Sequence, residues 1–231
     1  MKRTLLMLAC TCFLSIGSVS AHGVGPKLNM NVTIAVNGVE VVSPANHQMP
    51  DGTVYVSLQA FGNVMNTPIE LSKDRKQATV AGKTLSNIHM IEGEPTASVR
   101  DLANAIGATN VSWDQEKKEA YVLVLPKGTI QLEPHVVPAM GEHWANPAEL
   151  PLGPIYGVYK GKLVFLEYMV AQEDFAKGKN YVNIAGMKGL PSPSVVQTDI
   201  EYQAHGHPGF EIPHFDIHAY FITDEEQQAI K

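Results

Sequence analysis

The chain has 231 residues, with 17 Lys and Arg against 23 Asp and Glu and a formal charge of −6 at pH 7. This acidic balance argues against nucleic acid and against anionic membrane surfaces as primary partners. The length allows one large domain or two small ones, and the composition is ordinary for a folded globular protein.

The N-terminal segment 1–21 has the pattern of a secretory signal peptide, with two basic residues, an apolar stretch over 5–16 and small residues that end at Ala21. A lipoprotein signal that uses Cys10 or Cys12 is the alternative. Cleavage after Ala21 would remove both cysteines, which excludes disulfides and thiolate zinc ligands from the mature protein. We therefore expect a secreted, extracytoplasmic protein with no transmembrane segment after cleavage, and a flexible N-terminus over 22–30.

Residues 31–42, NVTIAVNGVEVV, contain two alternating β-runs joined by Asn37-Gly38. An Asn-Gly pair between such runs is the strongest short-range signal for a β-hairpin. We expect this hairpin to open the folded part of the chain.

An internal repeat follows, with one copy over 56–80 and a second over 97–122. In each copy a serine, Ser57 or Ser98, occupies the N-cap position of a helix whose apolar residues recur at helical spacing. A short strand, a charged turn and a last strand complete each copy. We expect an α+β module built from two related β-α-β-β units that share one sheet and one core.

Residues 31–125 resemble the copper amine oxidase N-terminal-like domain. The matching stretches are Val36-Asn37-Gly38, Ser98-Val99-Arg100, Ala105-Ile106-Gly107 and Val111-Ser112-Trp113-Asp114. The resemblance implies a non-catalytic accessory domain that acts as a spacer or in cell-wall association. It does not imply oxidase chemistry, because the quinone-forming motif Thr-x-x-Asn-Tyr-Asp/Glu is only approached, at Asn180-Tyr181.

Residues 126–134, PKGTIQLEP, interrupt the periodic pattern and indicate a linker. The segment 135–231 then reads as a mainly β domain, barrel- or sandwich-like. Its candidate strands are Ile155–Tyr159, Leu163–Val170, Val195–Tyr202 and Ile212–Ile222. Gly161 indicates a tight turn between the first two strands, and Thr223 is the expected N-cap of a short terminal helix.

The last strand has two faces of opposite character, because side chains alternate along a β-strand. The polar face carries His214, Asp216, His218 and Tyr220. The apolar face carries Phe215, Ile217, Ala219 and Phe221. We expect the apolar face to pack on a core and the polar face to contact water, a cavity or a ligand. An ordinary solvent-exposed face and a buried hydrogen-bond network are the alternatives to a functional site.

Metal coordination is the functional interpretation that the polar face favours. Glu167 is the single charge within LVFLEYMV, where an unpaired buried carboxylate would be costly. His143 lies in a predicted loop next to Trp144. The sequence therefore predicts a divalent metal, Zn, Cu, Fe or Mn, held by neutral imidazoles and carboxylates. The first-choice ligands are His143, Glu167, His214 and His218.

Three further residues are second-choice ligands: Asp216, His207 and His205. Asp216 would bind the metal or orient an imidazole. The sequence His205-Gly206-His207 places two imidazoles on one side of an extended stretch, and Pro208-Gly209 can turn the chain back towards the last strand.

The C-terminal part, about 135–222, resembles a sparsely characterised domain of secreted bacterial proteins. The matching stretches are Gly141-Glu142-His143-Trp144, Pro154-Ile155-Tyr156-Gly157, Glu167-Tyr168-Met169, Pro191-Ser192-Pro193, Gly206-His207-Pro208-Gly209 and Pro213-His214-Phe215-Asp216-Ile217-His218. The resemblance implies a β-rich fold and a homo-oligomer, and it supplies no reaction.

Together these features predict a secreted cell-envelope protein that binds a divalent metal in its C-terminal domain, with cell wall or envelope components as partners. One alternative is a metal-dependent hydrolase or lyase with Glu167 or Asp216 as the general base. A second alternative is a metal-free envelope interaction protein. Whether the protein is an enzyme stays open at this point.

Overall fold

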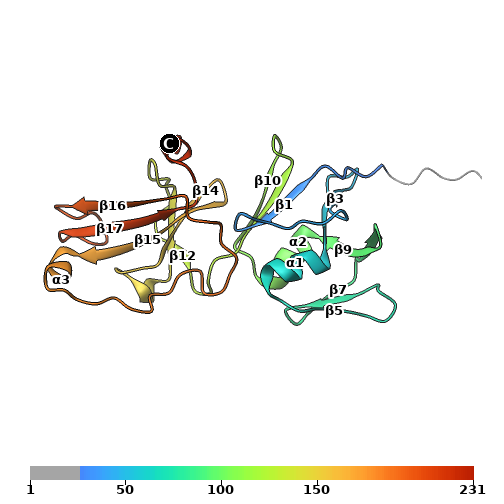
Figure 1. Ribbon diagram of the computed structural model, residues 1–231. Coiled ribbons are helices and arrows are strands. Elements are labelled where there is room, and N and C mark those ends of the chain that lie inside the picture. The colour runs from blue at the N-terminus through green and yellow to red at the C-terminus, as the bar shows by residue number, and fades with distance from the viewer. Residues whose placement is uncertain (1–26) are drawn as a thin grey trace, which may run out of the picture.

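Figure 1 shows a computed structural model of the protein, which describes residues 27–231. The predicted signal peptide and the first part of the segment 22–30 lie outside the described residues. The fold is mostly β, and the described residues form several sheets. Within the described range, no helix has the length and apolar character to cross a membrane.

One four-stranded sheet begins with the predicted hairpin. Its strands, in spatial order, are β10 (Asn110–Asp114), β11 (Glu119–Leu123), β1 (Thr33–Val36) and β2 (Val39–Glu40). The turn between β1 and β2 is at Asn37-Gly38, so this prediction is confirmed. Both turn residues have a positive φ, 49° and 83°, a conformation that Asn and Gly adopt most readily.

The two helices begin at the predicted serines. Helix α1 (Leu58–Met65) is capped by Ser57 and helix α2 (Val99–Ile106) by Ser98, since each hydroxyl accepts a hydrogen bond from a backbone N–H in the first turn. Strand β4 (Val54–Ser57) leads into α1, and β9 (Glu94–Ser98) leads into α2. Each helix is followed by two strands: β5 (Ile69–Leu71) and β6 (Ala78–Val80) after α1, and β10 and β11 after α2.

The expectation of one shared sheet was wrong, whereas the expectation of a shared core is confirmed. Strands β5 and β6 form a separate sheet with β7 (Lys83–Leu85), and β4 and β9 pair inside a third sheet, with β3 (His47–Gln48) and β8 (His89–Ile91) at its edges. One hydrophobic cluster nevertheless contains buried residues from both helices and from strands of all three sheets. The two helices fill the space between the sheets, so a common core does not require a common sheet (Figure 1).

The C-terminal half contains one six-stranded antiparallel sheet. In spatial order its strands are β12 (Ile130–Gln131), β13 (Glu142–Ala145), β14 (Ile155–Tyr159), β15 (Lys162–Ala171), β17 (His214–Tyr220) and β16 (Gln197–Gln203). The four predicted strands are present with ends shifted by at most two residues. The order is linear, with β12 and β16 at the edges, so the sheet does not close. The sheet has the form of a half-barrel.

Short helices and turns complete this half. They are the 3-10 helix η1 (Pro147–Glu149), α3 (Gln172–Ala176) and α4 (Asp224–Gln228). Lys160 and Gly161 form the tight turn of the β14–β15 hairpin with φ of 51° and 76°. Thr223 caps α4 and forms a reciprocal capping box with Glu226. The predictions of the turn and of this N-cap are therefore confirmed.

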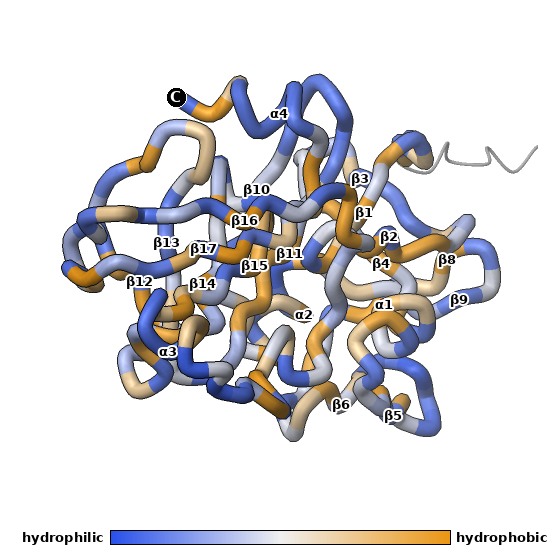
Figure 2. Tube along the Cα trace, turned by 60° about the vertical axis from the view of Figure 1, so that its left-hand side comes forward, coloured by the Kyte–Doolittle hydropathy of each residue, from blue (hydrophilic) through white to orange (hydrophobic). Residues whose placement is uncertain are grey.

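The two halves meet through a buried apolar cluster. The N-terminal half contributes Ala35, Tyr121, Leu123 and Leu125. The C-terminal half contributes Tyr156, Val158 and Leu163. Strands β11 and β15, which supply several of them, lie side by side (Figure 2). The predicted linker 126–134 contains the short strand β12, so the chain between the halves is partly ordered within the C-terminal sheet.

Candidate metal centre

The polar face of β17 is the buried one. His214, Asp216 and His218 are at most 1% exposed, whereas Phe215 and Ile217 on the opposite face are only half-buried. The expectation that the apolar face packs on the core was therefore wrong. The physical reason is the curvature of the sheet, because the polar side chains lie on its inner face beside buried residues of β15 such as Phe165.

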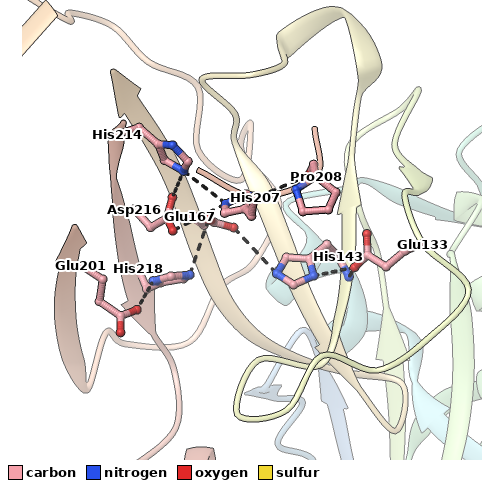
Figure 3. Close-up of polar contacts among 9 residues, drawn as sticks. All are labelled: Glu133, His143, Glu167, Glu201, His207, Pro208, His214, Asp216 and His218. Carbon is pink, nitrogen blue, oxygen red and sulfur yellow. Dashed lines mark hydrogen bonds and ion pairs between the residues drawn. The ribbon is translucent and has the colours of Figure 1, made fainter. Parts of the chain in front are cut away.

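Three side chains on this inner face meet closely enough to hold one metal ion. One ligand atom each from His207, His214 and Asp216 lies within 4.8 Å of the others. His214 Nε2 is 3.1 Å from Asp216 Oδ1 and 3.2 Å from His207 Nε2, and His207 Nε2 is 3.7 Å from Asp216 Oδ2 (Figure 3). Two imidazoles and one carboxylate are a ligand set that suits zinc and other divalent transition metals.

Backbone contacts orient both imidazoles for this role. His214 Nδ1 donates to the carbonyl of Ile212 at 2.6 Å, and His207 Nδ1 donates to the carbonyl of Pro208 at 3.2 Å. In a neutral imidazole with a protonated Nδ1, the Nε2 atom carries a lone pair. Both lone pairs therefore point at each other and at the carboxylate of Asp216, an arrangement that a cation would stabilise.

A tight turn brings His207 to the strand. His207 and Phe210 exchange two backbone hydrogen bonds across Pro208-Gly209, which confirms that this pair turns the chain back. Gly206 precedes the turn with a φ of 67°, and a Cβ there would overlap with the carbonyl oxygen of Phe210. Glycine is therefore required at this position. His205, one residue earlier, is exposed and takes no part in the group.

The other three predicted ligands form an adjoining cluster. Glu167 lies between two imidazoles, with Oε2 4.0 Å from His143 Nε2 and Oε1 3.6 Å from His218 Nε2 (Figure 3). The placement of His143 in a loop was wrong: it lies on β13, opposite Gly157 of β14. The structure thus brings six of the seven predicted residues to one face, in two groups, and their roles as ligands stay a prediction.

Several polar atoms of this face are buried and lack a hydrogen-bond partner among residues 27–231. They are Glu167 Oε2, Asp216 Oδ1, the Tyr220 hydroxyl and both ring nitrogens of His218. Buried polar groups are paired in the large majority of cases, so unpaired ones usually mark a bound water, an ion or a functional group. Here they gather on one inner face of the sheet.

Burial shifts the protonation of two groups in the adjoining cluster. Burial, and then the negative charges of Asp216, Glu133 and Glu201, raise the pKa of Glu167 to about 8. Burial lowers the pKa of His218 to about 4, although the charge of Asp216 acts in the opposite direction. At neutral pH the Glu167 carboxyl is therefore mostly protonated and the His218 imidazole is neutral.

Sequence reasoning missed two carboxylates around this cluster. Glu133 lies in the predicted linker and binds His143, with its Oε1 2.5 Å from the ring Nδ1 and 2.9 Å from the backbone N–H. Glu201, on the edge strand β16, approaches His218 Nδ1 at 3.5 Å. The alternation TDIEYQ could have indicated that Glu201 shares a strand face with Asp199, but no local signal points to Glu133.

A cavity of about 410 Å³ opens beside both groups. Its polar wall consists of Glu133, His135, His143, Glu167, Gln203, His207 and Asp216. The rest of the wall is mainly apolar and includes Leu132, Val137, Met140, Leu150, Ile155 and Met169. Within the described part of the chain, no Lys or Arg lines this cavity. A concave, mostly apolar space with a few convergent polar groups is typical of small-molecule sites.

Comparisons with known proteins add little to this picture. No protein-family model and no curated protein matches the chain. Among solved structures, the crystal structure of a hypothetical protein from Thermus thermophilus, TTHB210, is similar over 42% of this chain and 91% of that chain, with 23% sequence identity and a TM-score of 0.39. A similarity of this strength assigns no function.

Proposed function

We propose that the protein binds one divalent transition metal ion through His207 Nε2, His214 Nε2 and the carboxylate of Asp216. The observation that carries the proposal is the convergence of three ligand atoms within 4.8 Å, two of them on fully buried side chains. Both imidazoles use Nδ1 for a backbone contact, and their Nε2 atoms face each other and the carboxylate of Asp216. Three protein ligands would leave a coordination position for water or another molecule.

The chemistry of the ligands favours zinc, copper, iron or manganese over calcium or magnesium. Imidazole nitrogen is a borderline ligand that binds these transition metals well, whereas calcium and magnesium prefer oxygen alone. The metals differ in preferred geometry, so metal analysis of the isolated protein has to identify the ion.

The setting that we propose is the cell envelope. The signal-peptide pattern over 1–21 supports secretion. The resemblance of residues 31–125 to the copper amine oxidase N-terminal-like domain supports a spacer or wall-association role for the first of two modules, and the metal would belong to the second, over 135–231.

Metal analysis of the untagged mature chain tests the proposed site. We expect about one equivalent of metal per chain after purification or after incubation with Zn²⁺, Cu²⁺, Fe²⁺ or Mn²⁺. His214→Ala should lose it, whereas His205→Ala, which removes an exposed histidine from the same segment, should retain it. A folded chain that takes up none of these ions, or loses them equally in both variants, would contradict the proposal and favour a metal-free interaction protein.

Catalysis at the metal is a second candidate, favoured by the cavity that two of the proposed ligands, His207 and Asp216, line. A metal in this position could polarise a carbonyl or activate water, as in metal-dependent hydrolases and lyases. Glu167 also lines the cavity. Burial raises the pKa of Glu167 in the metal-free protein, so its carboxyl could supply a proton as well as act as the base that the sequence suggested. Turnover that requires both the metal and Glu167 would support this candidate.

A further inference from the structure

The cavity beside the candidate metal centre has one polar end and a larger apolar part. The polar end contains His207 and Asp216 of the metal group and His143 and Glu167 of the adjoining cluster. At about 410 Å³ the space is near the lower limit of the ~300–1,000 Å³ that ligand pockets commonly have. It would therefore hold a small molecule, with most of its surface against hydrocarbon.

A polar group of the wall also lacks a partner within the described protein. Glu167 is 3% exposed, and its Oε2 forms no hydrogen bond with any residue that the structure describes. Because Glu167 lines the cavity, a ligand's polar head or a water beside it could supply the missing contact. The apolar side chains of the wall have no polar atom that could make this contact.

The charge at the polar end selects the kind of head group. A divalent ion with two neutral imidazoles and the carboxylate of Asp216 has one positive charge left. Glu133 also lines the cavity, but its carboxylate accepts hydrogen bonds from the ring Nδ1 and the backbone N–H of His143. No Lys or Arg of the described residues lines the cavity to attract an anion elsewhere. One anionic oxygen ligand at the remaining coordination position would neutralise that charge. The apolar wall then requires the rest of the molecule to be uncharged hydrocarbon.

We propose that the cavity binds a small apolar monocarboxylic acid, with its carboxylate on the metal and its hydrocarbon part against the apolar wall. This inference rests on the proposed metal site and adds the class of ligand. The head group lies next to His143 and Glu167, and the hydrocarbon part packs against Val137, Leu150 and the two methionines of the wall.

Those methionines provide a direct measurement. Met140 and Met169 line the cavity, whereas Met65 on α1 and Met90 on β8 belong to the other half of the chain. Benzoate is the probe, added to the zinc-loaded protein with ¹³C-labelled methionine methyl groups. We expect the methyl resonances of Met140 and Met169 to shift on titration and those of Met65 and Met90 to stay in place.

Filling the apolar part of the cavity provides the matched comparison. Val137→Phe should weaken benzoate binding at least tenfold and keep the zinc, whereas Val42→Phe, at a side chain that is 74% exposed, should change neither. Leu150→Phe serves the same purpose if the first variant does not fold. Equal benzoate affinity in a folded, zinc-loaded cavity variant and in the Val42 control would overturn the proposal.

The head group is tested with benzylamine and toluene under the same conditions. The proposal predicts that benzoate binds at least tenfold more tightly than either. A preference for benzylamine, equal binding of toluene, or a zinc-loaded protein with no shift at Met140 and Met169 would overturn it while the metal site stands. Failure to load zinc would overturn both proposals, and the metal content shows which of these results has occurred.

Discussion

The Nε2 atoms of His207 and His214 lie 3.2 Å apart, although the other nitrogen of each ring donates to a backbone carbonyl. When both rings are neutral with the proton on Nδ1, neither Nε2 has a proton to offer to the other, and the nearest other group is the carboxylate of Asp216. Without a cation, this arrangement would bring three electron-rich atoms together inside the protein. The contact is therefore informative about metal binding in a way that a mere histidine count is not.

Metal should stabilise the folded protein through these ligands. A ligand that binds only the folded state adds about 2.7 kcal/mol at a hundred times its dissociation constant. Zinc should therefore raise the melting temperature of the wild-type protein, and Asp216→Asn should remove most of that increase. Thermal unfolding followed by circular dichroism measures both. An equal increase in the variant would show that zinc binds elsewhere.

Substitution of Gly206 should weaken metal binding without direct contact with the ion. Gly206→Ala places a Cβ against the carbonyl oxygen of Phe210, which should displace His207 and reduce metal affinity by about 10–100-fold, as for supporting residues of other metal sites. Gly209→Ala is the matched control, because this glycine also has a positive φ but open space around it. Competition with a chromophoric chelator measures the affinities. Similar losses in the two variants would contradict this account.

Glu167 should make the metal-free protein less stable as the pH rises. The folded state keeps the carboxyl proton up to a pKa of about 8, whereas the unfolded chain releases it near 4.5. The folded state therefore binds more protons between these values, and the free energy of unfolding falls through that window as pH increases. Glu167→Gln should remove this pH-dependent loss of stability. The free energy of unfolding of the variant should exceed that of the wild type by an amount that increases with pH, to a few kcal/mol at most.

Urea unfolding with a chelator present, at pH values from about 5 to 9, measures this difference. The comparison is between variant and wild type, because the depressed pKa of His218 gives the wild type an opposite slope at lower pH. The charged and titratable groups around Glu167 are His143 from β13, Asp216 and His218 from β17, Glu133 and Glu201. The exposed Glu116→Gln variant is the control, and a parallel pH profile for both variants would contradict the prediction.

Asn37 should be important for stability beyond its role in the turn. Its buried side chain exchanges two hydrogen bonds with Val124 and donates a third to the carbonyl of Pro191. Asn37→Ala should reduce the free energy of unfolding by ~3 kcal/mol, since each such bond contributes about 1 kcal/mol. Asn66→Ala, also at a left-handed position but exposed, should cost clearly less in the same urea experiment.

Local signals in the sequence located many elements of the fold, including those that carry the site. The alternation of β17, the Lys160-Gly161 turn, the helix caps at Ser57, Ser98 and Thr223, and the Pro208-Gly209 turn all depend on neighbouring residues, and all are present. They could be predicted because capping and turn formation use short-range backbone hydrogen bonds.

The orientation of β17 could not be predicted in this way. Alternation separates two faces of a strand but does not say which face is inside, and hydrophobicity indicated the wrong one. The inner position of His214 and His218 depends on the curvature of six strands and on long-range neighbours such as Glu167 and Glu133. The same reason explains the error at His143, whose strand exists only through pairing with β14.

The Tyr121 hydroxyl accepts a hydrogen bond from the backbone N–H of Leu163, at the start of the strand that carries Glu167. Around this contact lies an apolar cluster to which both halves contribute. A protease that cuts the chain within 126–134 should therefore release no fragment, because the two pieces would stay associated as a nicked complex. Occupancy of the metal site would then protect the N-terminal piece from unfolding, although none of the proposed ligands belongs to that piece.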